Sequence, residues 1–296
     1  MPAPSLTARS DRGFVYVATG AGYLAEARRS AASVRQLHRD APICLITDQP
    51  LAPDGVFTIV QAPRGPVEHK PVDKLLAIEA PFPGCVFLDT DTLARDDLSA
   101  LFELLDHFDL AAHQDLKRGW HYVLPDVPAV FSEFNTGVLA FRRSPAMEEF
   151  FRAWRVEYGN LHAQLGLVND QPAFRRALYH SRLRVAPLPS EYHFLGNAPN
   201  SLLWKVRLVH ARGDLAAIAR TAEEQLGDRV YIPGVGVITA FRGRRHWLRT
   251  TLHIFWRMLR LAFSPPRDSA AANPGQWWLE ETSRPPPPPR PDSHGS

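Results

Sequence analysis

The feature that most constrains this chain is an alternation of short apolar runs with helical patterns over residues 14–105. Residues 14–19 form a β-branched and aromatic run that ends at Gly20, and apolar residues then recur at helical spacing over residues 24–37. Further strands are predicted at residues 43–47, 56–60 and 85–88, and a further helix at residues 73–80. Strands that alternate with helices predict an α/β fold with a mostly parallel sheet covered on both faces.

The strand ends of this predicted sheet carry polar residues. In open α/β sheets, ligands bind at the carboxyl ends of the strands. The first strand ends at Thr19 and Gly20, the second at Asp48, and the fourth at the segment that contains Asp89 and Asp91. We therefore expect these side chains to converge at one edge of the sheet.

Asp89 and Asp91 are separated by one residue on an extended segment, so their carboxylates point the same way and can bind a divalent cation. The pattern alone is weak, because 18 Asp in 296 residues give about one such pair by chance. Solvation of a turn is the alternative, but it needs only one carboxylate, and two neighbouring carboxylates repel each other. The position at a strand end therefore favours a metal site.

The second half of the chain has a less regular pattern. A polar, Pro-containing loop is predicted at residues 114–128, a strand at 137–141, a helix at 147–158 and a late strand at 205–210. Asp170 precedes another helix with Pro172 near its first turn, so we expect it to be the N-cap. Loops of this kind often bind the acceptor substrate.

Composition restricts the class of protein. The net charge of +3 is concentrated near the C-terminus, so we expect no nucleic-acid partner. Cys44 and Cys85 lie in apolar runs and are expected to be buried, which excludes a disulfide framework and a cysteine-based zinc site. Residues 1–13 lack the apolar stretch of a signal peptide, and no run of about 18 apolar residues occurs. We expect a cytoplasmic chain.

The composition also predicts four segments. They are a flexible N-terminus at residues 1–13, a folded domain at 14–241, a basic amphipathic helix at 242–263 and a disordered Pro-rich tail at 264–296. Apolar residues of the helix recur at three- and four-residue steps among arginines, which predicts peripheral contact with the inner face of a membrane. Packing on the domain or on a second copy remains the alternative.

Five ordered motifs between residues 14 and 212 resemble the GT-A fold glycosyltransferases, in particular the retaining branch that includes glycogenin and the lipopolysaccharide galactosyltransferases. The motifs are Val15-Tyr16-Val17-Ala18-Thr19-Gly20, Phe87-Leu88-Asp89-Thr90-Asp91, Phe134-Asn135-Thr136-Gly137-Val138, Asp170-Gln171 and Val209-His210. The resemblance implies a single GT-A domain that moves a hexose from a nucleotide-diphospho-sugar, a UDP-sugar in particular, with Mn²⁺ or Mg²⁺ as cofactor.

The resemblance also assigns roles by position. Asp89, Asp91 and His210 would bind the metal; Asn135, Asp170 and Gln171 would line the donor sugar and take part in catalysis; and Thr19, Gly20, Asp48, Lys74, Asp89 and Arg212 would bind the donor nucleotide. Arg212 would take the place of a lysine that the family has at this position. The alternative for Lys74 is that it is an ordinary charged residue on the exposed face of a helix. Because the amide of Gln171 is a poor covalent nucleophile, front-face retention of configuration is favoured over double displacement.

The segment from Gly20 to Ala25 also fits a dinucleotide fingerprint, with Asp48 as a ribose contact, so an NAD-dependent oxidoreductase is the alternative function. The fingerprint leaves the later motifs unexplained. A non-catalytic adaptor that acts through the Pro-rich tail is a third class. The acceptor, whether a glycan, a lipid-linked sugar or a protein, depends on loops near Trp120, Tyr122 and Tyr192.

Overall fold

The computed structural model describes residues 11–115, 124–224 and 226–239. It also describes Leu248, Thr251, Leu252, residues 254–256, Met258, Leu259 and Phe263. The predicted Pro-rich tail, most of the N-terminal segment and the loop that carries Trp120 and Tyr122 lie outside the described residues. The first strand of the domain begins at Arg12.

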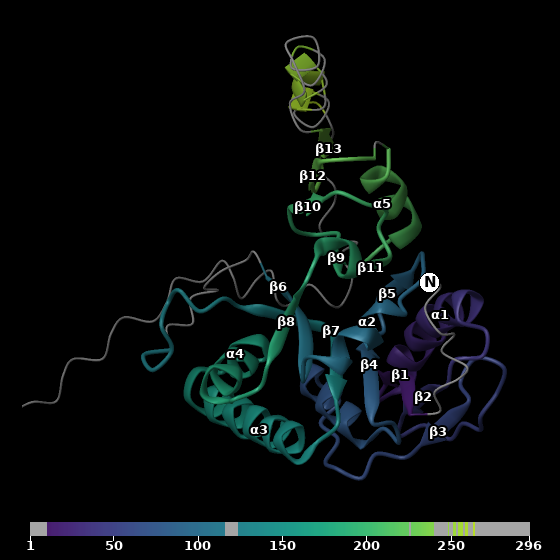
Figure 1. Cartoon of the computed structure of the whole chain (residues 1–296), viewed down its shortest axis with the longest axis vertical. Helices are drawn as coiled ribbons and strands as arrows, with labels where there is room; N and C mark the ends of the chain where they lie inside the picture. The colour runs from purple at the N-terminus through teal and green to yellow at the C-terminus, as the bar shows by residue number, and fades with distance from the viewer. Residues whose placement is uncertain are drawn as a thin grey trace, which may run out of the picture.

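A seven-stranded sheet forms the centre of the domain (Figure 1). In spatial order its strands are β3 (Ile59–Gln61), β2 (Ile43–Ile46), β1 (Arg12–Val17), β4 (Gly84–Leu88), β7 (Phe134–Arg142), β6 (Leu110–Gln114) and β8 (Val185–Leu188). Strands β3, β2, β1 and β4 are parallel, whereas β7 runs antiparallel to both β4 and β6. The predicted mostly parallel α/β sheet is confirmed, with one reversed strand in its middle.

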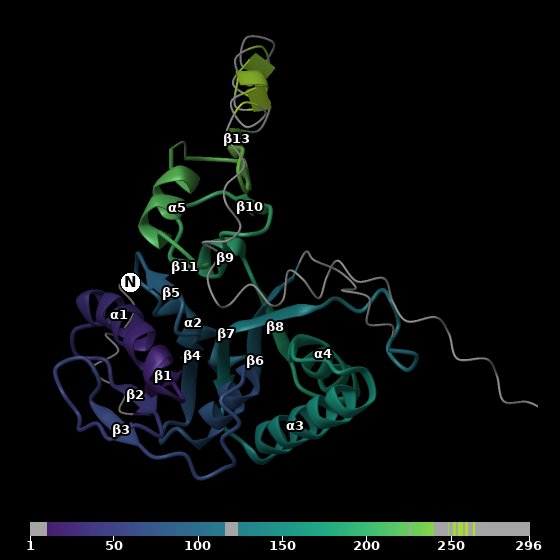
Figure 2. The same ribbon diagram turned by 180° about the vertical axis from the view of Figure 1, so that it is seen from behind.

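Helices cover both faces of the sheet (Figures 1 and 2). One face packs against α1 (Ala21–Leu37) and α2 (Ala100–Glu103), and the other against the 3-10 helix η2 (Pro71–Glu79), α3 (Pro145–Leu165) and α4 (Gln171–His180). Strand β1 shows how the sequence builds two cores, because Phe14 and Tyr16 face the first set of helices and Val15 and Val17 the second. Both cysteines are buried, as predicted.

The pair α3 and α4 positions one side of the candidate site. Ser144 caps α3 by accepting a hydrogen bond from the Met147 N–H at 3.2 Å. Further along α3, the fully buried Trp154 packs edge-on against Phe174, with 4.8 Å between the ring centroids. Its indole N–H donates to the carbonyl oxygen of Asp170 at 3.1 Å, so α3 fixes the residue at which α4 begins.

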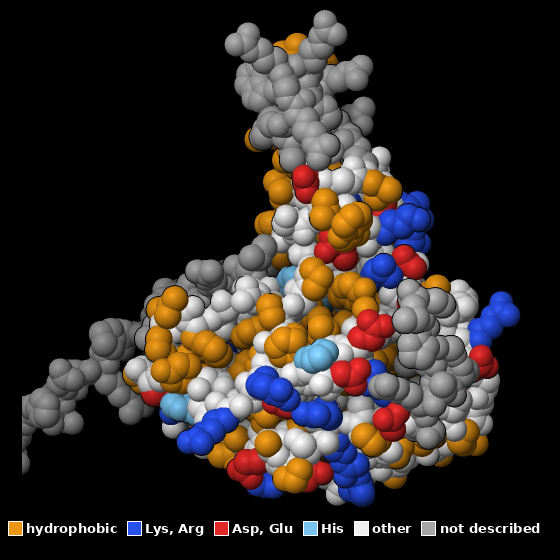
Figure 3. Space-filling model, viewed as in Figure 1, with side chains coloured by type: hydrophobic (Ala, Val, Ile, Leu, Met, Phe, Trp, Pro, Cys, Tyr) orange, Lys and Arg blue, Asp and Glu red, His pale blue; other side chains and the backbone are white. Residues whose placement is uncertain are grey.

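Two small sheets and a helix extend the domain beyond the carboxyl ends of the central strands (Figure 1). One sheet contains β5 (Thr92–Ala94), β11 (Leu208–His210) and β9 (Phe194–Leu195), and the other contains β10 (Asn200–Leu202), β12 (Arg229–Ile232) and β13 (Gly236–Thr239). With α5 (Leu215–Ala222), they enclose a third, smaller core. Figure 3 shows hydrophobic side chains at the surface of this part, and Leu203, Trp204 and Val230 are among the exposed ones.

Three predicted elements differ from the structure, and the late strand predicted at residues 205–210 begins only at Leu208. The third strand begins at Ile59, because residues 54–57 form a turn in which the Asp54 side chain accepts backbone hydrogen bonds. The helix predicted at residues 73–80 is the 3-10 helix η2, which begins earlier, at Pro71. Within the described residues, no helix has both the length and the apolar character needed to cross a membrane.

Candidate metal and donor site

Three potential metal ligands meet at the carboxyl end of the central sheet. Asp89 and Asp91 follow β4, and His210 ends β11, which pairs antiparallel with β5 so that His210 lies opposite Thr92. One ligand atom from each of the three lies within 4.8 Å of the others. The His210 Nε2 atom is 3.2 Å from Asp91 Oδ1 and 3.9 Å from Asp89 Oδ2. Two carboxylates and one imidazole form a donor set that suits Mn²⁺.

Gly137 on β7 makes room for this cluster. Its carbonyl oxygen accepts the Asp89 N–H at 2.8 Å, which brings the β7 backbone directly beneath the ligands. A Cβ atom at this position would lie 2.2 Å from His210 Cε1 and 3.0 Å from Asp89 Oδ2. The glycine is therefore required by the imidazole next to it, and not by the backbone conformation of the strand.

Lys74 connects the candidate metal ligands to the rest of the site. Its Nζ atom is 3.2 Å from Asp89 Oδ2, 3.1 Å from Thr136 Oγ1 and 3.6 Å from Asp170 Oδ1, and its side chain is 10% exposed. Although burial opposes it, the carboxylates of Asp170 and Asp89 raise the pKa of Lys74. An exposed helix charge, the alternative role for Lys74, is therefore wrong.

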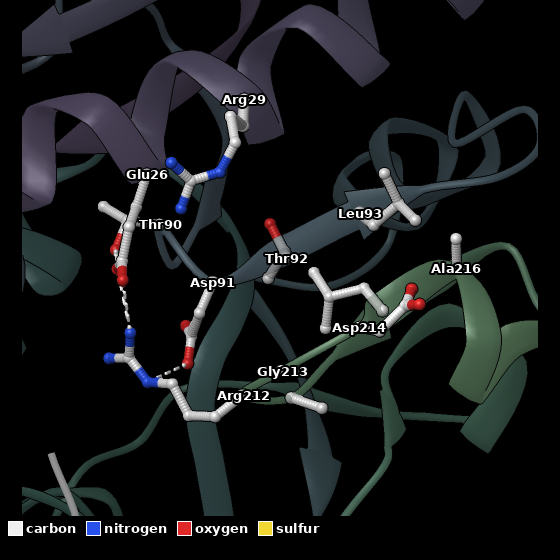
Figure 4. Close-up of a pocket in the computed structure, with 12 residues that line it drawn as sticks. Glu26, Arg29, Thr90, Asp91, Thr92, Leu93, Arg212, Gly213, Asp214 and Ala216 are labelled. Atoms are coloured by element: carbon white, nitrogen blue, oxygen red, sulfur yellow. Dashed lines mark hydrogen bonds and ion pairs between the residues drawn. The ribbon is translucent and has the colours of Figure 1, made fainter. Parts of the chain in front are cut away.

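Arg212 binds the other aspartate. Its Nε atom is 3.0 Å from Asp91 Oδ2, and its terminal nitrogen is 2.8 and 2.9 Å from the two carboxylate oxygens of Glu26 on α1 (Figure 4). These residues line a cavity of about 300 Å³ between α1 and the loop after β11. Figure 4 shows Arg29 and Asp214 at the same cavity. Arg212 thus places a positive charge next to the candidate metal ligands.

The two aspartates have different electrostatic environments. Burial raises the pKa of Asp89, although Lys74 and His210 oppose the shift. Burial also acts on Asp91, but there the charges of His210 and Arg212 outweigh it and lower the pKa to about 2. In turn, Asp91 raises the pKa of His210 against the effect of burial. Protonation of His210 and binding of a cation at its Nε2 atom are therefore in competition.

The predicted sugar-binding residues meet around a carboxylate that the sequence did not single out. Asp115 Oδ2 accepts hydrogen bonds from Asn135 Nδ2 and from Gln171 Nε2, each at 3.3 Å. Asp170 Oδ2 accepts a hydrogen bond from Thr136 Oγ1 at 2.7 Å. Asp170 is the N-cap of α4, as predicted, but its carboxylate makes no capping bond and instead points toward Lys74 and Thr136.

The predicted nucleoside contacts lie at the ends of β1 and β2. Gly20 has a φ of +86°, and its N–H donates to Asp48 Oδ1 at 2.8 Å. This hydrogen bond lowers the pKa of the exposed Asp48 carboxyl. Thr19 is buried, and its hydroxyl donates to Asp73 Oδ2 at 2.7 Å. Gly20 and Asp48 therefore face the surface of the site, whereas Thr19 is held within the fold.

Three residues of the site, Asp115, Glu26 and His193, were not singled out from the sequence. Asp115 follows β6 without a flanking motif, and Glu26 lies on the exposed side of a helical pattern. His193 contacts His210 from a segment 17 residues earlier in the chain. Thr136 belongs to a quoted motif, but its contact with Lys74, 62 residues away, was not foreseen. The strand-end position of Asp115 was the one feature that pointed to it, since ligand contacts gather at that edge of the sheet.

The fold is that of the GT-A glycosyltransferases. The glycosyltransferase GlyE of Streptococcus pneumoniae TIGR4 matches with a TM-score of 0.50 and 14% identity, over 88% of this chain and 66% of GlyE. The galactosyltransferase LgtC, in complex with donor and acceptor sugar analogues, matches with a TM-score of 0.49 and 17% identity, over 87% of this chain and 99% of LgtC. No protein-family model matches the chain, and neither does any curated protein sequence.

Proposed function

We propose that the protein is a metal-dependent glycosyltransferase that moves a sugar from a nucleotide-sugar donor to a sugar-containing acceptor. The observation that carries this proposal is the cluster of Asp89, Asp91 and His210 at the carboxyl edge of a GT-A sheet. A UDP-sugar is the donor we favour, following the resemblance of the five sequence motifs. The acceptor class stays open among glycans, lipid-linked sugars and proteins.

The residues of the cluster fit a divalent cation, and Mn²⁺ more closely than Mg²⁺ because one ligand is an imidazole. When bound, such a cation supplies a Lewis acid that neutralises charge on the leaving nucleoside diphosphate. Gly137 leaves the space that the imidazole occupies beside the two carboxylates. Asp89, Asp91 and His210 are therefore the proposed metal ligands.

The basic residues of the site complement a diphosphate. Asp89, Asp91 and Asp170 carry three negative charges when ionised, and Lys74 and Arg212 carry two positive ones, so the group has a small negative charge that a divalent cation reverses. A site that is positive only with its metal favours an anionic donor over a neutral sugar. In this proposal Lys74 and Arg212 orient the donor phosphates, and Gly20 and Asp48 contact the nucleoside.

The sugar side of the site supports retention of configuration. Asn135, Gln171 and Asp115 form a hydrogen-bonded group whose polar atoms suit sugar hydroxyls. Gln171 supplies an amide oxygen, which stabilises positive charge at the anomeric carbon but is a poor covalent nucleophile. We propose front-face transfer, with Asp170 holding Lys74 in position.

The oxidoreductase alternative is not favoured. Its fingerprint requires a loop that receives a pyrophosphate and an acidic residue that binds the ribose. Here Asp48 already accepts the N–H of Gly20, the first residue of that fingerprint. The metal-ligand cluster, Lys74 and the Asp115 group have no role in hydride transfer.

The C-terminal stretch suggests where in the cell the acceptor lies. Residues 242–263 contain six arginines and no acidic residue. Leu248, Leu252, Phe255 and Trp256 are helical, and each exposes more than half of its surface. We propose that this segment binds an anionic membrane surface, because apolar side chains among basic residues fit such a surface. The arginines themselves lie outside the described residues.

Donor hydrolysis is the direct test of the catalytic proposal. A panel of nucleotide sugars is incubated with the full chain and Mn²⁺, and release of the nucleoside diphosphate is measured. We expect turnover of one donor, its loss in excess chelator, and its loss in Asp91→Asn. Asp40→Asn is the matched control, because it makes the same charge change at an exposed turn beyond the far end of α1. Equal activity with and without chelator would contradict the proposal.

A further inference from the structure

We propose that His193 is a positioning residue that fixes the tautomer of His210 and so keeps the His210 Nε2 lone pair available to a cation. The inference rests on the proposed metal site and adds a residue to it. His193 lies between the 3-10 helix η4 (Ser190–Tyr192) and β9, and β9 pairs with β11 so that Leu195 lies opposite His210. This register brings the two histidines together.

The contact between the rings is close and enclosed. His193 Nε2 lies 2.8 Å from His210 Nδ1, and the ring planes differ by 21°. His193 is 0% exposed, and the ring of His113 stands against it at 65°, with 5.5 Å between centroids. His113 is itself held by Ser190 Oγ, 3.3 Å from its Nε2 atom. The His193 ring therefore has little freedom to turn away from His210.

The positions of the hydrogens follow from the geometry. A neutral imidazole has one N–H and one lone pair, so ligation through His210 Nε2 requires the hydrogen on Nδ1. That Nδ1–H faces His193 Nε2, which must then accept it. If His193 donated instead, His210 would carry its hydrogen on Nε2 and present an N–H to the two carboxylates. Binding of a cation is thus linked to one direction of a single hydrogen bond.

Nothing else in the described part of the chain fixes the His193 tautomer. Its Nδ1 atom is buried and has no hydrogen-bond partner among these residues. The tautomer is therefore decided at the contact with His210. Metal-binding histidines almost always donate their second ring N–H to an acceptor, and loss of such a partner lowers metal affinity by about 10- to 100-fold. Here the acceptor is a second histidine.

Two substitutions separate the hydrogen bond from packing. His193→Phe fills the space but offers no acceptor, whereas His193→Gln places an amide oxygen near the position of Nε2. The dissociation constant of Mn²⁺ alone is measured for the full chain by electron paramagnetic resonance of free Mn²⁺, together with the melting temperature. We expect His193→Phe to weaken binding by about 10- to 100-fold and His193→Gln to restore most of it.

Matched controls make each outcome decisive. His107→Phe makes the same replacement at an exposed turn before β6, at the edge of the sheet opposite the site, and should bind Mn²⁺ like the unsubstituted chain. If His193→Phe does not fold, His193→Asn replaces it, because its shorter side chain does not reach His210 and should fail where Gln succeeds. Natural affinity in folded His193→Phe, or equal losses in Gln and Asn, would overturn the inference. Asp91→Asn reports on the metal site itself: if it too binds Mn²⁺ normally, the proposed site is wrong, and not only the role of His193.

Discussion

Replacement of Gly137 by alanine tests whether the candidate site depends on the position of His210. The added Cβ would lie 2.2 Å from His210 Cε1 and 2.6 Å from His210 Nδ1. Ordinary contacts begin near 3.4 Å, so the ring must move by about 1.2 Å, the difference between 3.4 and 2.2 Å. The ring has no free space behind Nδ1, because His193 Nε2 is already 2.8 Å away.

The expected effect follows from that displacement. Metal sites tolerate shifts of about 0.5 Å in their ligands, so a movement of more than twice that size should weaken Mn²⁺ binding by at least about 10-fold. Overpacking of a close-packed site also costs about 1–3 kcal/mol of folding free energy. We therefore expect Gly137→Ala to be folded, less stable and deficient in metal binding.

The assay combines Mn²⁺ titration, followed by electron paramagnetic resonance, with urea unfolding of the same samples. Gly159→Ala is the matched control, because a Cβ at this exposed position in α3 meets nothing within 4 Å. It should bind Mn²⁺ normally and gain up to about 1 kcal/mol, since alanine is the better helix former. Natural Mn²⁺ affinity in folded Gly137→Ala would refute the reasoning from the His210 position.

Three further predictions concern charge. In excess chelator, Asp91→Asn should lower the free energy of unfolding by about 2 kcal/mol, because the pKa of the Asp91 carboxyl is depressed in the folded chain. Asp89→Asn should not lower it, because the pKa of the Asp89 carboxyl is raised. Urea unfolding of both variants checks this prediction. Hydrogen bonds from Arg184 and Arg142 lower the pKa of Asp109 to about 2, so Asp109 contributes stability above pH 4 that is lost as the pH falls toward 2. Between pH 4 and pH 2, the free energy of unfolding of Asp109→Asn should therefore fall by about 1 kcal/mol less than that of the unsubstituted chain, as measured by acid titration. The full chain should co-sediment with anionic vesicles in low salt and less in high salt. A chain that ends at residue 241 should stay folded and should not bind the vesicles. If both chains co-sediment equally, residues 242–263 pack against the domain or a second copy.

Loss of Asp91 is expected to affect stability differently from loss of Asp89. In the sequence the two residues are neighbouring strand-end carboxylates that repel each other. In the structure the Asp91 side chain is only 15% exposed and pairs with both His210 and Arg212. Removal of one member of such a group leaves its partners uncompensated. We therefore expect a loss of stability on removal of Asp91 but not on removal of Asp89.

The ends of the central strands could be predicted from the sequence, because each is an apolar run followed directly by polar residues. This pattern identified Asp89, Asp91 and His210, which the structure brings together. The direction of β7 was not predictable, because a fully buried strand has the same composition in either direction and only its connection decides. The 3-10 form of η2 was equally hidden, since its apolar spacing also fits an α-helix.

Residues that act through distant partners were the least predictable. Lys74 was identified by its position, but its burial depends on Asp170 and Thr136, which come from α4 and β7. Asp115 has no local motif at all, and its importance appears only when Asn135 and Gln171 converge on it. Such groups are determined by packing between elements and not by periodicity within one of them.

The pairing of β5 with β11 also determines when the site can form during folding. Thr92 and His210 are opposite each other, yet 118 residues separate them, the difference between 210 and 92. A contact of such high sequence separation carries a large loop-closure entropy and forms late relative to local structure. We therefore expect the two aspartates to be in place on the central sheet before the histidine arrives. A partly folded or prematurely ended chain lacks the third ligand, so donor binding becomes a property of the finished domain alone.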